Sequence, residues 1–582
     1  MGIAIFLAAA VTTLLWLTIL GRGLTFFYDE WDFINAAATT GYWHSVLQPH
    51  NGHPSMIPFS VYWVLLHTVG LRHYWPYQLL LVLLDIGCGW LLFVLLRRKV
   101  HPAVAAAASA VLMLLGPAWQ DLLWPFQIGF LGSVAGGLGA LLLLDRDTRR
   151  SDVGACACLV ASVGCSGVGL PFLAGVGVEL LWRRRDWRRL WVPAFPLALF
   201  VVWYESTGRR STSSVSLTTM LRTMIDATTA TVGILAGRSP ALGTLVTCIL
   251  VVLAVVGLWR RPGRAARLAM AITGLVTFWA LTLLARGVSL TTSQGRYLYP
   301  AGVFILLAIG ELPSLLSTSV PLYGPTAPPR LMRGIAVAAV VGLVAYAGLA
   351  IWWNSGTLTD GRNGLLRVSS RVRPELGAVV LAGSALPQNF RPDPAYVPQV
   401  SVGPLLRAVA TFGSPAENKQ DLTASGQGST STLDRLLLRG RPIRASGTAD
   451  LPISVAGECE RFAVTLSSQV PDFTLPARGV RVSAPQSAAI AIRARSLSRL
   501  FPSRPLDTIP PGATRSIEWS ARPTNIRWQV ALTTMPLAAP PGSTVTVCPG
   551  PRDARPNGSR LTRVGRPHGS VAANWDRYSG RR

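Results

Sequence analysis

Residues 3–20 read IAIFLAAAVTTLLWLTIL, and residues 75–96 read WPYQLLLVLLDIGCGWLLFVLL. An α-helix rises about 1.5 Å per residue, so a run of roughly 17 to 22 apolar residues crosses the hydrocarbon core of a bilayer, which is about 30 Å thick. The whole chain of 582 residues is 50% hydrophobic and only 14% charged, which is too apolar for a soluble protein of this length. Both stretches therefore predict membrane-spanning helices. The first is expected to be retained, because it lacks the cationic start and the cleavage site of a signal peptide.

Further apolar runs bring the predicted number of spans to about eleven, within a transmembrane bundle of residues 1–354. They lie at residues 102–116, 124–144, 153–170, 171–182, 190–204, 241–259, 268–285, 297–316 and 334–353. The pair that meets at Leu170 and Pro171 has a single re-entrant unit as its alternative. A polar and aromatic loop, residues 22–74, follows the first span. Within this loop, residues 55–69 predict a helix that lies in the membrane interface, because the run is short and contains Pro58.

Short basic clusters separate the spans and fall on one side of the predicted bundle. They are Arg97 to Lys99, Arg146 with Arg149 and Arg150, Arg183 to Arg189, Arg260 to Arg267, and Arg330 with Arg333. The positive-inside rule makes this side cytoplasmic. The sequence therefore predicts a multi-pass protein of the cytoplasmic membrane, with a cytoplasmic N-terminus and an extracytoplasmic C-terminal domain. Basic residues in loops between spans are typical of membrane topology, so the net charge of +27 does not indicate a nucleic-acid partner.

Residues 355–549 have a different composition, in which Pro and Gly turns separate short β-prone stretches. The alternation of apolar and polar side chains in residues 526–532 and 545–547 predicts a mainly-β domain outside the cytoplasm, with some helix around residues 433–438. Cys459 and Cys548 would form one disulfide in an oxidising compartment, although the sequence also allows two free thiols. Residues 550–582 are rich in Arg, Pro, Gly and Ser and are predicted to be disordered.

The acidic cluster Asp29-Glu30-Trp31-Asp32 lies directly outside the first predicted span. One interpretation is structural: Asp29 caps a helix through residues 33–38, and the other two carboxylates favour its first turn. The second interpretation is chemical. Aromatic side chains beside carboxylates suit a sugar-binding site, and a carboxylate can remove the proton from an attacking hydroxyl group.

More polar side chains occur in the same predicted outer regions. His50, Asn51 and His53 are candidates for binding substrate or a divalent metal, whereas the alternative is an ordinary Gly-containing loop. Asp121 and Gln127 are candidates for contact with a sugar. The tryptophans around them are also typical of an interfacial aromatic belt.

Two motifs resemble the GT-C superfamily of membrane glycosyltransferases, which includes protein O-mannosyltransferases, the aminoarabinose transferases of lipid A, and the arabinofuranosyltransferases of actinobacterial envelopes. Phe27-Tyr28-Asp29-Glu30 looks like the acidic signature in the first outer loop of these enzymes. Residues 294–300, QGRYLYP, resemble their Arg-Tyr-x-x-Pro pattern, and residues 53–70 are similar to their juxtamembrane helix. The resemblance extends over about 300 residues, mostly through topology.

The resemblance implies an inverting transferase that moves a sugar from a polyprenyl-phosphate donor to a glycan, lipid or protein acceptor during biogenesis of the cell envelope and cell wall. Asp29 would be the catalytic base, with Glu30 and Asp32 as helpers or sugar ligands. The candidate groups for the donor phosphate are Arg296, Tyr297 and, more weakly, Arg72 and Arg286. The resemblance implies no certain cofactor; a divalent metal ion, which some members of the superfamily use, is the one candidate, and no residue is committed as its ligand.

Two other functions remain as alternatives. Asp85 lies inside a predicted span, where a carboxylate either has a hydrogen-bond partner or marks a transport path, so a transporter or flippase of envelope precursors is one alternative. Against it, the sequence has no internal repeat of the kind common in transporters. The other alternative is a non-catalytic membrane protein of envelope assembly, in which the acidic cluster would tolerate substitution.

Overall fold

The structure is a computed structural model of the whole chain. It describes residues 1–183, 187–207, 215–237, 240–293, 295–316, 329–424, 427–440, 442–447, 459–463, 473–476, 479–498, 501, 505–519, 527–535 and 543–549. The predicted disordered tail, residues 550–582, lies outside these residues, as does Gln294. Contacts divide the chain into two units, which are described separately. Unit 1 comprises Met1–Arg371 with Ala408–Pro415, and unit 2 comprises Val372–Arg407 with Ala416–Arg582.

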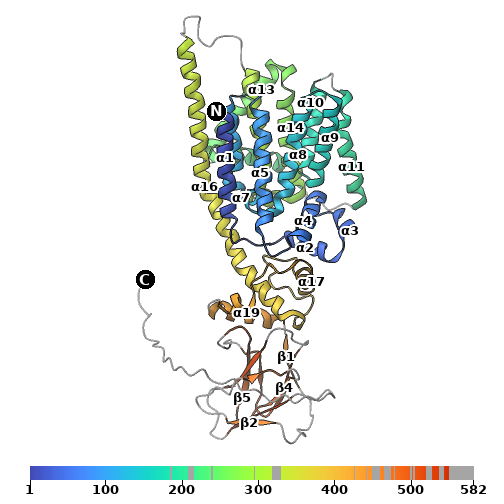
Figure 1. Cartoon of the computed structure of the whole chain (residues 1–582), viewed down its shortest axis with the longest axis vertical. Coiled ribbons are helices and arrows are strands. Elements are labelled where there is room, and N and C mark those ends of the chain that lie inside the picture. The colour runs from blue at the N-terminus through green and yellow to red at the C-terminus, as the bar shows by residue number, and fades with distance from the viewer. Residues whose placement is uncertain are drawn as a thin grey trace. The chain divides into compact units, whose positions relative to one another are not determined.

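Unit 1 is a bundle of long helices that carries short helices at one end (Figure 1). The long helices are α1 (Gly2–Leu20), α5 (Trp75–Leu96), α6 (Pro102–Met113), α8 (Ile128–Leu144), α9 (Arg149–Cys165), α10 (Gly169–Trp182), α11 (Trp191–Thr207), α12 (Leu217–Leu235), α13 (Pro240–Arg260), α14 (Ala266–Ser293), α15 (Leu298–Leu316) and α16 (Pro329–Ala382). The short elements are α2 (Glu30–Thr39), α3 (Tyr42–Val46), α4 (Met56–Thr68), α7 (Trp119–Leu123) and the 3₁₀ helices η1 (Gly116–Ala118), η2 (Pro125–Gln127), η3 (Trp187–Arg189), η4 (Pro262–Arg264) and η5 (Gly295–Tyr297).

The long helices have the length and polarity of membrane spans. Among the described residues, 8 helices are long and apolar enough to cross a membrane, or up to 9 if α6 and Gly116–Leu123 form one bent span. Every run predicted from the sequence as a span falls on a helix. Outward-facing side chains of α13, such as Leu245, Ile249 and Val252, are apolar, as contact with lipid requires.

Ion pairs connect four of the five predicted basic loops at one end of the bundle. Arg98 pairs with Asp145 at 2.8 Å, and Lys99 pairs with Glu311 at 3.0 Å. Arg267, which is 8% exposed, also pairs with Asp145, at 2.7 Å. Arg183 lies within 3.9 Å of the same carboxylate. The start of α1 lies at this end too, because a Cβ on Gly2 would contact Pro102. These loops and the N-terminus therefore share one side of the bundle, as the loop charges predict.

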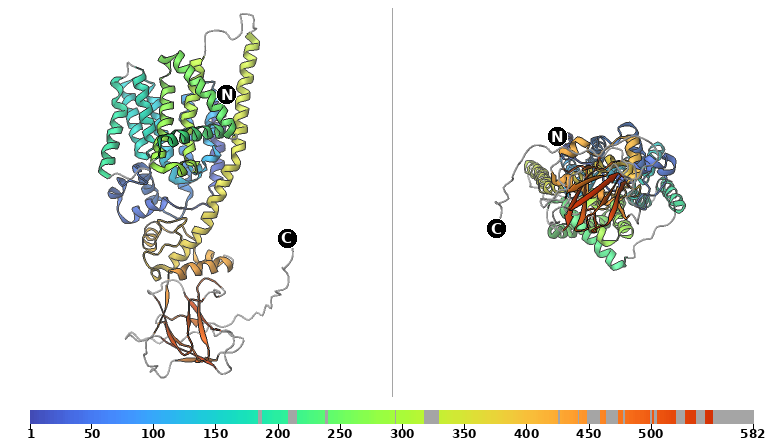
Figure 2. Two further views of the ribbon diagram at one scale, coloured as in Figure 1. Left: turned by 180° about the vertical axis from the view of Figure 1, so that it is seen from behind. Right: turned by 90° about the horizontal axis from the view of Figure 1, so that it is seen from below.

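Helix α16 extends along the bundle beside α1 (Figures 1 and 2). Its polar continuation is fastened to the end of α1, since Arg362 Nε donates a hydrogen bond to the Leu20 carbonyl oxygen at 3.0 Å. The predicted domain boundary at residues 354 and 355 falls inside this continuous helix, and the contacts divide the chain after Arg371. Helix α12 lies between the predicted spans at residues 190–204 and 241–259, where the sequence predicts no span.

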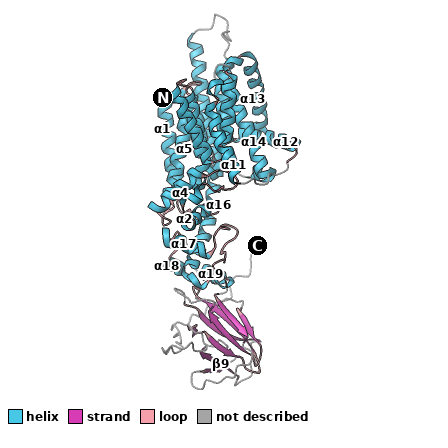
Figure 3. Cartoon of the chain, turned by 90° about the vertical axis from the view of Figure 1, so that its right-hand side faces the viewer, coloured by secondary structure: helices cyan, strands magenta, loops and turns pink. Residues whose placement is uncertain are grey.

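Unit 2 combines helices with antiparallel sheets, and the described strands all belong to it (Figure 3). Its helical part contains the end of α16, η6 (Gly383–Ala385), most of α17 (Val402–Phe412), α18 (Lys419–Ala424) and α19 (Gln427–Arg439). The strands are β1 (Ile443–Gly447), β2 (Glu460–Ala463), β3 (Phe473–Thr474), β4 (Val480–Ser483), β5 (Ala489–Arg495), β6 (Asp507–Ile509), β7 (Thr514–Trp519), β8 (Gln529–Met535) and β9 (Thr544–Pro549). They form one sheet in the order β1-β7-β4-β9-β2 and a second in the order β3-β8-β5-β6.

Alternating side chains give each sheet a buried face, as the period-two sequence pattern predicts. Val480 and Val482 of β4 and Val545 and Val547 of β9 are buried. The Asp434 carboxylate of α19 accepts hydrogen bonds from the backbone N–H groups of residues 496–498, which fastens α19 to the end of β5. The expected disulfide is confirmed: Cys459 is bonded to Cys548, across 89 residues of sequence.

Candidate active site

Asp29 occupies the N-cap position of α2, at the end of the bundle where α1 finishes and α5 begins. The structural interpretation is confirmed in part: α2 begins after Asp29 and has Glu30 and Asp32 in its first turn, but the Asp29 side chain makes no capping hydrogen bond. The carboxylate is instead 6% exposed and accepts a hydrogen bond from Asn51 Nδ2 at 3.3 Å. Tyr28 and Asn51 have φ of 51° and 50°, a left-handed conformation that side chains rarely adopt and that is often found at functional sites.

Glu30 faces the protein interior, because it opens α2 and its side chain leaves the helix in a different direction from that of Asp29. It is fully buried and accepts hydrogen bonds from the Tyr62 hydroxyl at 2.7 Å, the Tyr74 hydroxyl at 3.1 Å and the Phe27 backbone N–H at 3.0 Å. Burial raises the pKa of Glu30 to about 8, although these hydrogen bonds lower it. Glu30 therefore fastens the loop to α4 and to Tyr74, the residue before α5.

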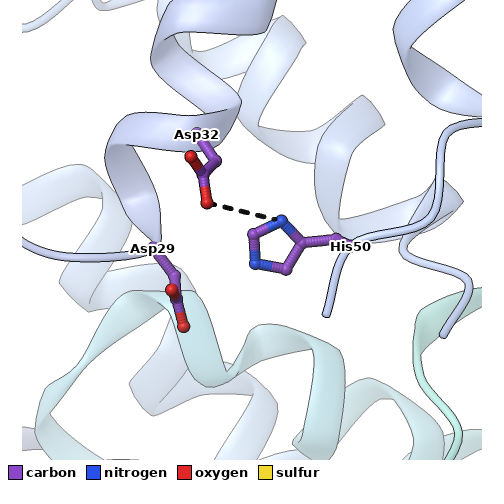
Figure 4. Close-up of side chains that lie close together, drawn as sticks. All are labelled: Asp29, Asp32 and His50. Atoms are coloured by element: carbon purple, nitrogen blue, oxygen red, sulfur yellow. Dashed lines mark ion pairs between the residues drawn. The ribbon is translucent and has the colours of Figure 1, made fainter. Parts of the chain in front are cut away.

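Asp32 and His50 line a cavity of ≈ 490 Å³ next to Asp29. The His50 Nδ1 atom lies 3.8 Å from Asp32 Oδ2 (Figure 4). Burial, and then the negative charge of Asp29, raise the pKa of Asp32 to about 6. Two aromatic rings line the cavity, those of Phe33 and Phe59, whose centroids lie 5.6 Å apart. A polar cavity with aromatic walls suits a sugar.

Asp29, Asp32 and His50 also fit a divalent cation. One ligand atom from each lies within 4.8 Å of the others, and carboxylate oxygens with an imidazole nitrogen are ordinary ligands of such ions. A cation would relieve the repulsion between the two carboxylates. The sequence offered His50 as a candidate ligand of a divalent metal, and the structure places it with two carboxylates from the start of α2.

The loop that carries His50 is a tight turn with a sequence signal of its own. His50 and His53 exchange two backbone hydrogen bonds of 3.1 Å, and Asn51 and Gly52 between them both have positive φ. An Asn-Gly pair favours this kind of turn. Burial, and next the charge of Arg286, lower the pKa of His53 to about 3, so its imidazole is neutral at neutral pH.

The positive charges of two arginines from distant parts of the chain affect the pKa of Asp29. Burial raises the pKa of the Asp29 carboxyl, while the positive charges of Arg296 and Arg286 lower it. Arg286 lies beside a kink of α14 at Gly287, whose φ is 72°, and its Nη2 atom donates a hydrogen bond to the Asn51 carbonyl oxygen at 3.2 Å. The structure thus brings the charges of the early acidic motif and of the late Arg-Tyr motif close together, and it places Arg286, a weaker candidate from the sequence, beside them.

Of the other residues that the sequence predicted for the site, some lie near Asp29 and Arg296 and one lies elsewhere. Tyr297 is buried with its ring 5.4 Å from the Arg296 guanidinium carbon, and Gln127 is 1% exposed. Arg72 is exposed and lies against Gly413, so the structure gives it no contact with the acidic cluster. Asp121, which the sequence also offered as a sugar contact, is fully buried, and the positive charge of Arg296 acts on its carboxyl group.

Comparisons with known proteins add a distant structural likeness. No protein-family description and no curated protein match the chain. Among solved structures, arabinosyltransferase EmbB from Mycobacterium smegmatis matches with a TM-score of 0.30 and 12% sequence identity. The match covers 93% of this chain and 64% of that chain, so the chain spans less than two thirds of the EmbB subunit.

Proposed function

We propose that this protein is a membrane glycosyltransferase of GT-C type, which transfers a sugar from a polyprenyl-phosphate donor to an acceptor of the cell envelope at the outer face of the cytoplasmic membrane. One observation carries the proposal. The buried Asp29 carboxylate lies beside a polar cavity with aromatic walls and under the influence of two arginines, Arg286 and Arg296. A base next to a cationic phosphate site is the minimum that an inverting sugar transfer needs.

In the proposed reaction, an acceptor hydroxyl oxygen attacks the anomeric carbon of the donor sugar. The hydroxyl proton passes to the Asp29 carboxylate as the new glycosidic C–O bond forms. The bond between the anomeric carbon and the phosphate oxygen breaks, and its electrons leave with the polyprenyl phosphate. Arg296 and Arg286 stabilise the negative charge that develops on this phosphate. A raised pKa suits Asp29 to the role, because a base works best when its pKa approaches the operating pH.

The neighbouring carboxylates have supporting roles in the proposal. Glu30 holds the loop in place through its buried hydrogen bonds and does not touch substrate. Asp32, His50 and Asn51 line the cavity and would bind sugar hydroxyls. A divalent cation held by Asp29, Asp32 and His50 would offset the negative charge of the two neighbouring carboxylates.

Placement of the site outside the cytoplasm is supported by two independent features. The ion-paired basic loops share the side of the bundle that the positive-inside rule makes cytoplasmic, and the acidic loop is separated from that side by α1. The disulfide of unit 2 is stable in an oxidising, extracytoplasmic compartment. A polyprenyl-phosphate sugar facing that compartment is the donor class that such a site would use.

The contacts of Asp85 favour the enzyme over the transporter alternative. Asp85, the intramembrane carboxylate on which it depends, accepts a hydrogen bond of 2.7 Å from the Tyr299 hydroxyl, as expected for a residue that connects α5 to α15.

The proposal is tested with membranes that contain equal amounts of wild type, Asp29→Asn and Asp226→Asn. Asp226 is an exposed aspartate of α12, so its replacement makes the same chemical change away from the site. Transfer is measured from radiolabelled polyprenyl-phosphate mannose, arabinofuranose and glucose. We expect transfer of one sugar by wild type and by Asp226→Asn and a loss of about 100-fold or more in Asp29→Asn. Equal transfer by Asp29→Asn and wild type would refute the assignment of Asp29.

A further inference from the structure

The segments α7 and η5, which lie far apart in the sequence, meet closely beside the candidate site. The backbone N–H of Arg296 donates a hydrogen bond to Gln120 Oε1 at 3.2 Å. Gly295 permits this approach, because a Cβ at its position would come within 2.1 Å of the Pro117 carbonyl oxygen. The contact places Arg296 and Tyr297 against the part of α7 that carries Asp121.

Several buried polar atoms at this junction, and on η2 next to α7, have no hydrogen-bond partner among the residues that the structure describes. They are Asp121 Oδ1 and Oδ2, Gln127 Nε2, Arg296 Nε and Tyr297 Oη. Asp121, Gln127 and Tyr297 are 0%, 1% and 4% exposed. More than about 90% of buried polar groups in folded proteins have partners, so such a group of unsatisfied atoms indicates a site for a ligand.

The charges at the junction define what the ligand must offer. Arg296 and Asp121 attract each other electrostatically, yet the described atoms form no hydrogen bond between them. Arg296 Nε–H and the Tyr297 hydroxyl group donate hydrogen bonds, whereas the Asp121 carboxyl oxygens accept them. A ligand that accepts hydrogen bonds at one end and donates them at the other satisfies both. A sugar phosphate has this combination, since phosphate oxygens accept and sugar hydroxyls donate.

We propose that Asp121 is a specificity-determining residue of the donor site and that its carboxylate accepts hydrogen bonds from hydroxyl groups of the donor sugar. Arg296 and Tyr297 donate to the phosphate, and Gln127 donates to a further oxygen of the ligand. Arg296 also acts on Asp29, so the bond to be broken lies between the sugar-binding carboxylate and the base. This inference rests on the proposed function and names the group that recognises the sugar.

The test measures binding to purified, detergent-solubilised full-length protein. The probes are farnesyl phosphate and its mannosyl, arabinofuranosyl and glucosyl derivatives, and the proteins are wild type, Asp121→Asn and the control Asp226→Asn. We expect wild type and the control to bind one sugar derivative about 10- to 100-fold more tightly than farnesyl phosphate, which is the range for hydrogen bonds to a charged group. Asp121→Asn is expected to lose this preference while its affinity for farnesyl phosphate stays within about threefold of wild type.

Thermal unfolding of the same proteins separates recognition from structure. Because Asp121 has no described hydrogen-bond partner to lose, we expect Asp121→Asn to melt no lower than wild type. A lower melting temperature with equally weakened binding of all probes would make Asp121 structural and overturn the inference. A preserved sugar preference in Asp121→Asn, or equal binding of all probes by wild type, would also overturn it while leaving Asp29 as the base. Failure of wild type to bind any probe would refute the proposed function itself.

Discussion

Asp29 and Glu30 are neighbours in sequence, yet their carboxylates have different surroundings and different proposed roles. The Glu30 oxygens are occupied by two tyrosine hydroxyls and a backbone N–H group, whereas Asp29 lies near Arg286 and Arg296. Acidic residues at the start of a helix could be predicted from the sequence. The sequence could not show which of the two carboxylates is enclosed, because the partners of Glu30 come from α4 and from the residue before α5.

The pH dependence of the melting temperature tests the role of Glu30. Its pKa is raised from 4.5 to about 8 in the folded protein, so the folded state binds the proton more tightly than the unfolded state. The melting temperature of wild type is therefore expected to fall as the pH rises toward 8, through the range between these two pKa values. Glu30→Gln, which is neutral and of similar shape, is expected to remove most of this slope and to retain the fold.

The control for Glu30 is Glu518→Gln, at an exposed position of β7. It is expected to keep the wild-type pH dependence. Glu30→Ala, which leaves the two tyrosine hydroxyls unpaired, is expected to lower the unfolding free energy by about 1–3 kcal/mol. A wild-type melting temperature that rises between pH 6 and pH 8 would contradict this account of Glu30.

A second test at the level of single residues is whether Asp29, Asp32 and His50 bind a divalent cation. We expect millimolar Mg²⁺, Mn²⁺ or Ca²⁺ to raise the melting temperature of wild type, because an ion that binds only the folded state stabilises it. Asp32→Asn and His50→Ala are expected to lose this shift, and His44→Ala, at the same cavity but outside the cluster, is expected to keep it. Equal melting of wild type with and without all three ions would exclude the cation site.

Among the elements, those defined by long apolar runs were predictable, because the length of a span is fixed by the thickness of the bilayer. Helix α5 has the predicted bounds, and α4 matches the predicted interfacial helix to within one residue at each end. Helix α12 was not predicted, since its mixed polar and apolar residues resemble a loop in hydropathy alone. The junction of α7 and η5 could not be predicted either, because it depends on a contact between short segments 176 residues apart.

A substitution at Gly295 tests whether the junction of α7 and η5 is important for transfer. Gly295→Ala is expected to push η5 away from η1, since the new Cβ would lie 2.1 Å from the Pro117 oxygen. Displacing Arg296 and Tyr297 by about 1 Å should reduce transfer by about 100-fold. Gly263→Ala, where a Cβ meets no atom within 4 Å, is the matched control and should leave the transfer rate unchanged. Wild-type transfer rates in Gly295→Ala would show that the site does not need this close contact.

At the scale of the whole molecule, the charges of the loops and the disulfide of unit 2 support one topology. Loop charge alone predicted which loops share a side, because Lys and Arg resist translocation through a membrane. The ion pairs of Asp145 with Arg98 and Arg267 bring those loops together, as predicted. The helical part of unit 2 was mostly missed, because its Pro- and Gly-rich composition is typical of turns between strands.

Reporter fusions test the topology. Alkaline phosphatase is expected to be active, and green fluorescent protein dark, when each is fused after Arg582 of the full chain. Fusions after Lys99 are expected to give the opposite result, since this residue belongs to a predicted cytoplasmic loop. Fluorescence from the fusion after Arg582 would place unit 2 in the cytoplasm and contradict the proposed outer location of the site.

The most direct test of the central claim is to measure donor binding and single-turnover transfer with the same preparation of Asp29→Asn. A base acts in the chemical step, so the variant is expected to bind the polyprenyl-phosphate sugar within about threefold of wild type and to transfer it about 10²- to 10⁴-fold more slowly. Wild-type transfer rates, or a loss of transfer explained entirely by lost donor binding, would contradict the assignment of Asp29 as the base.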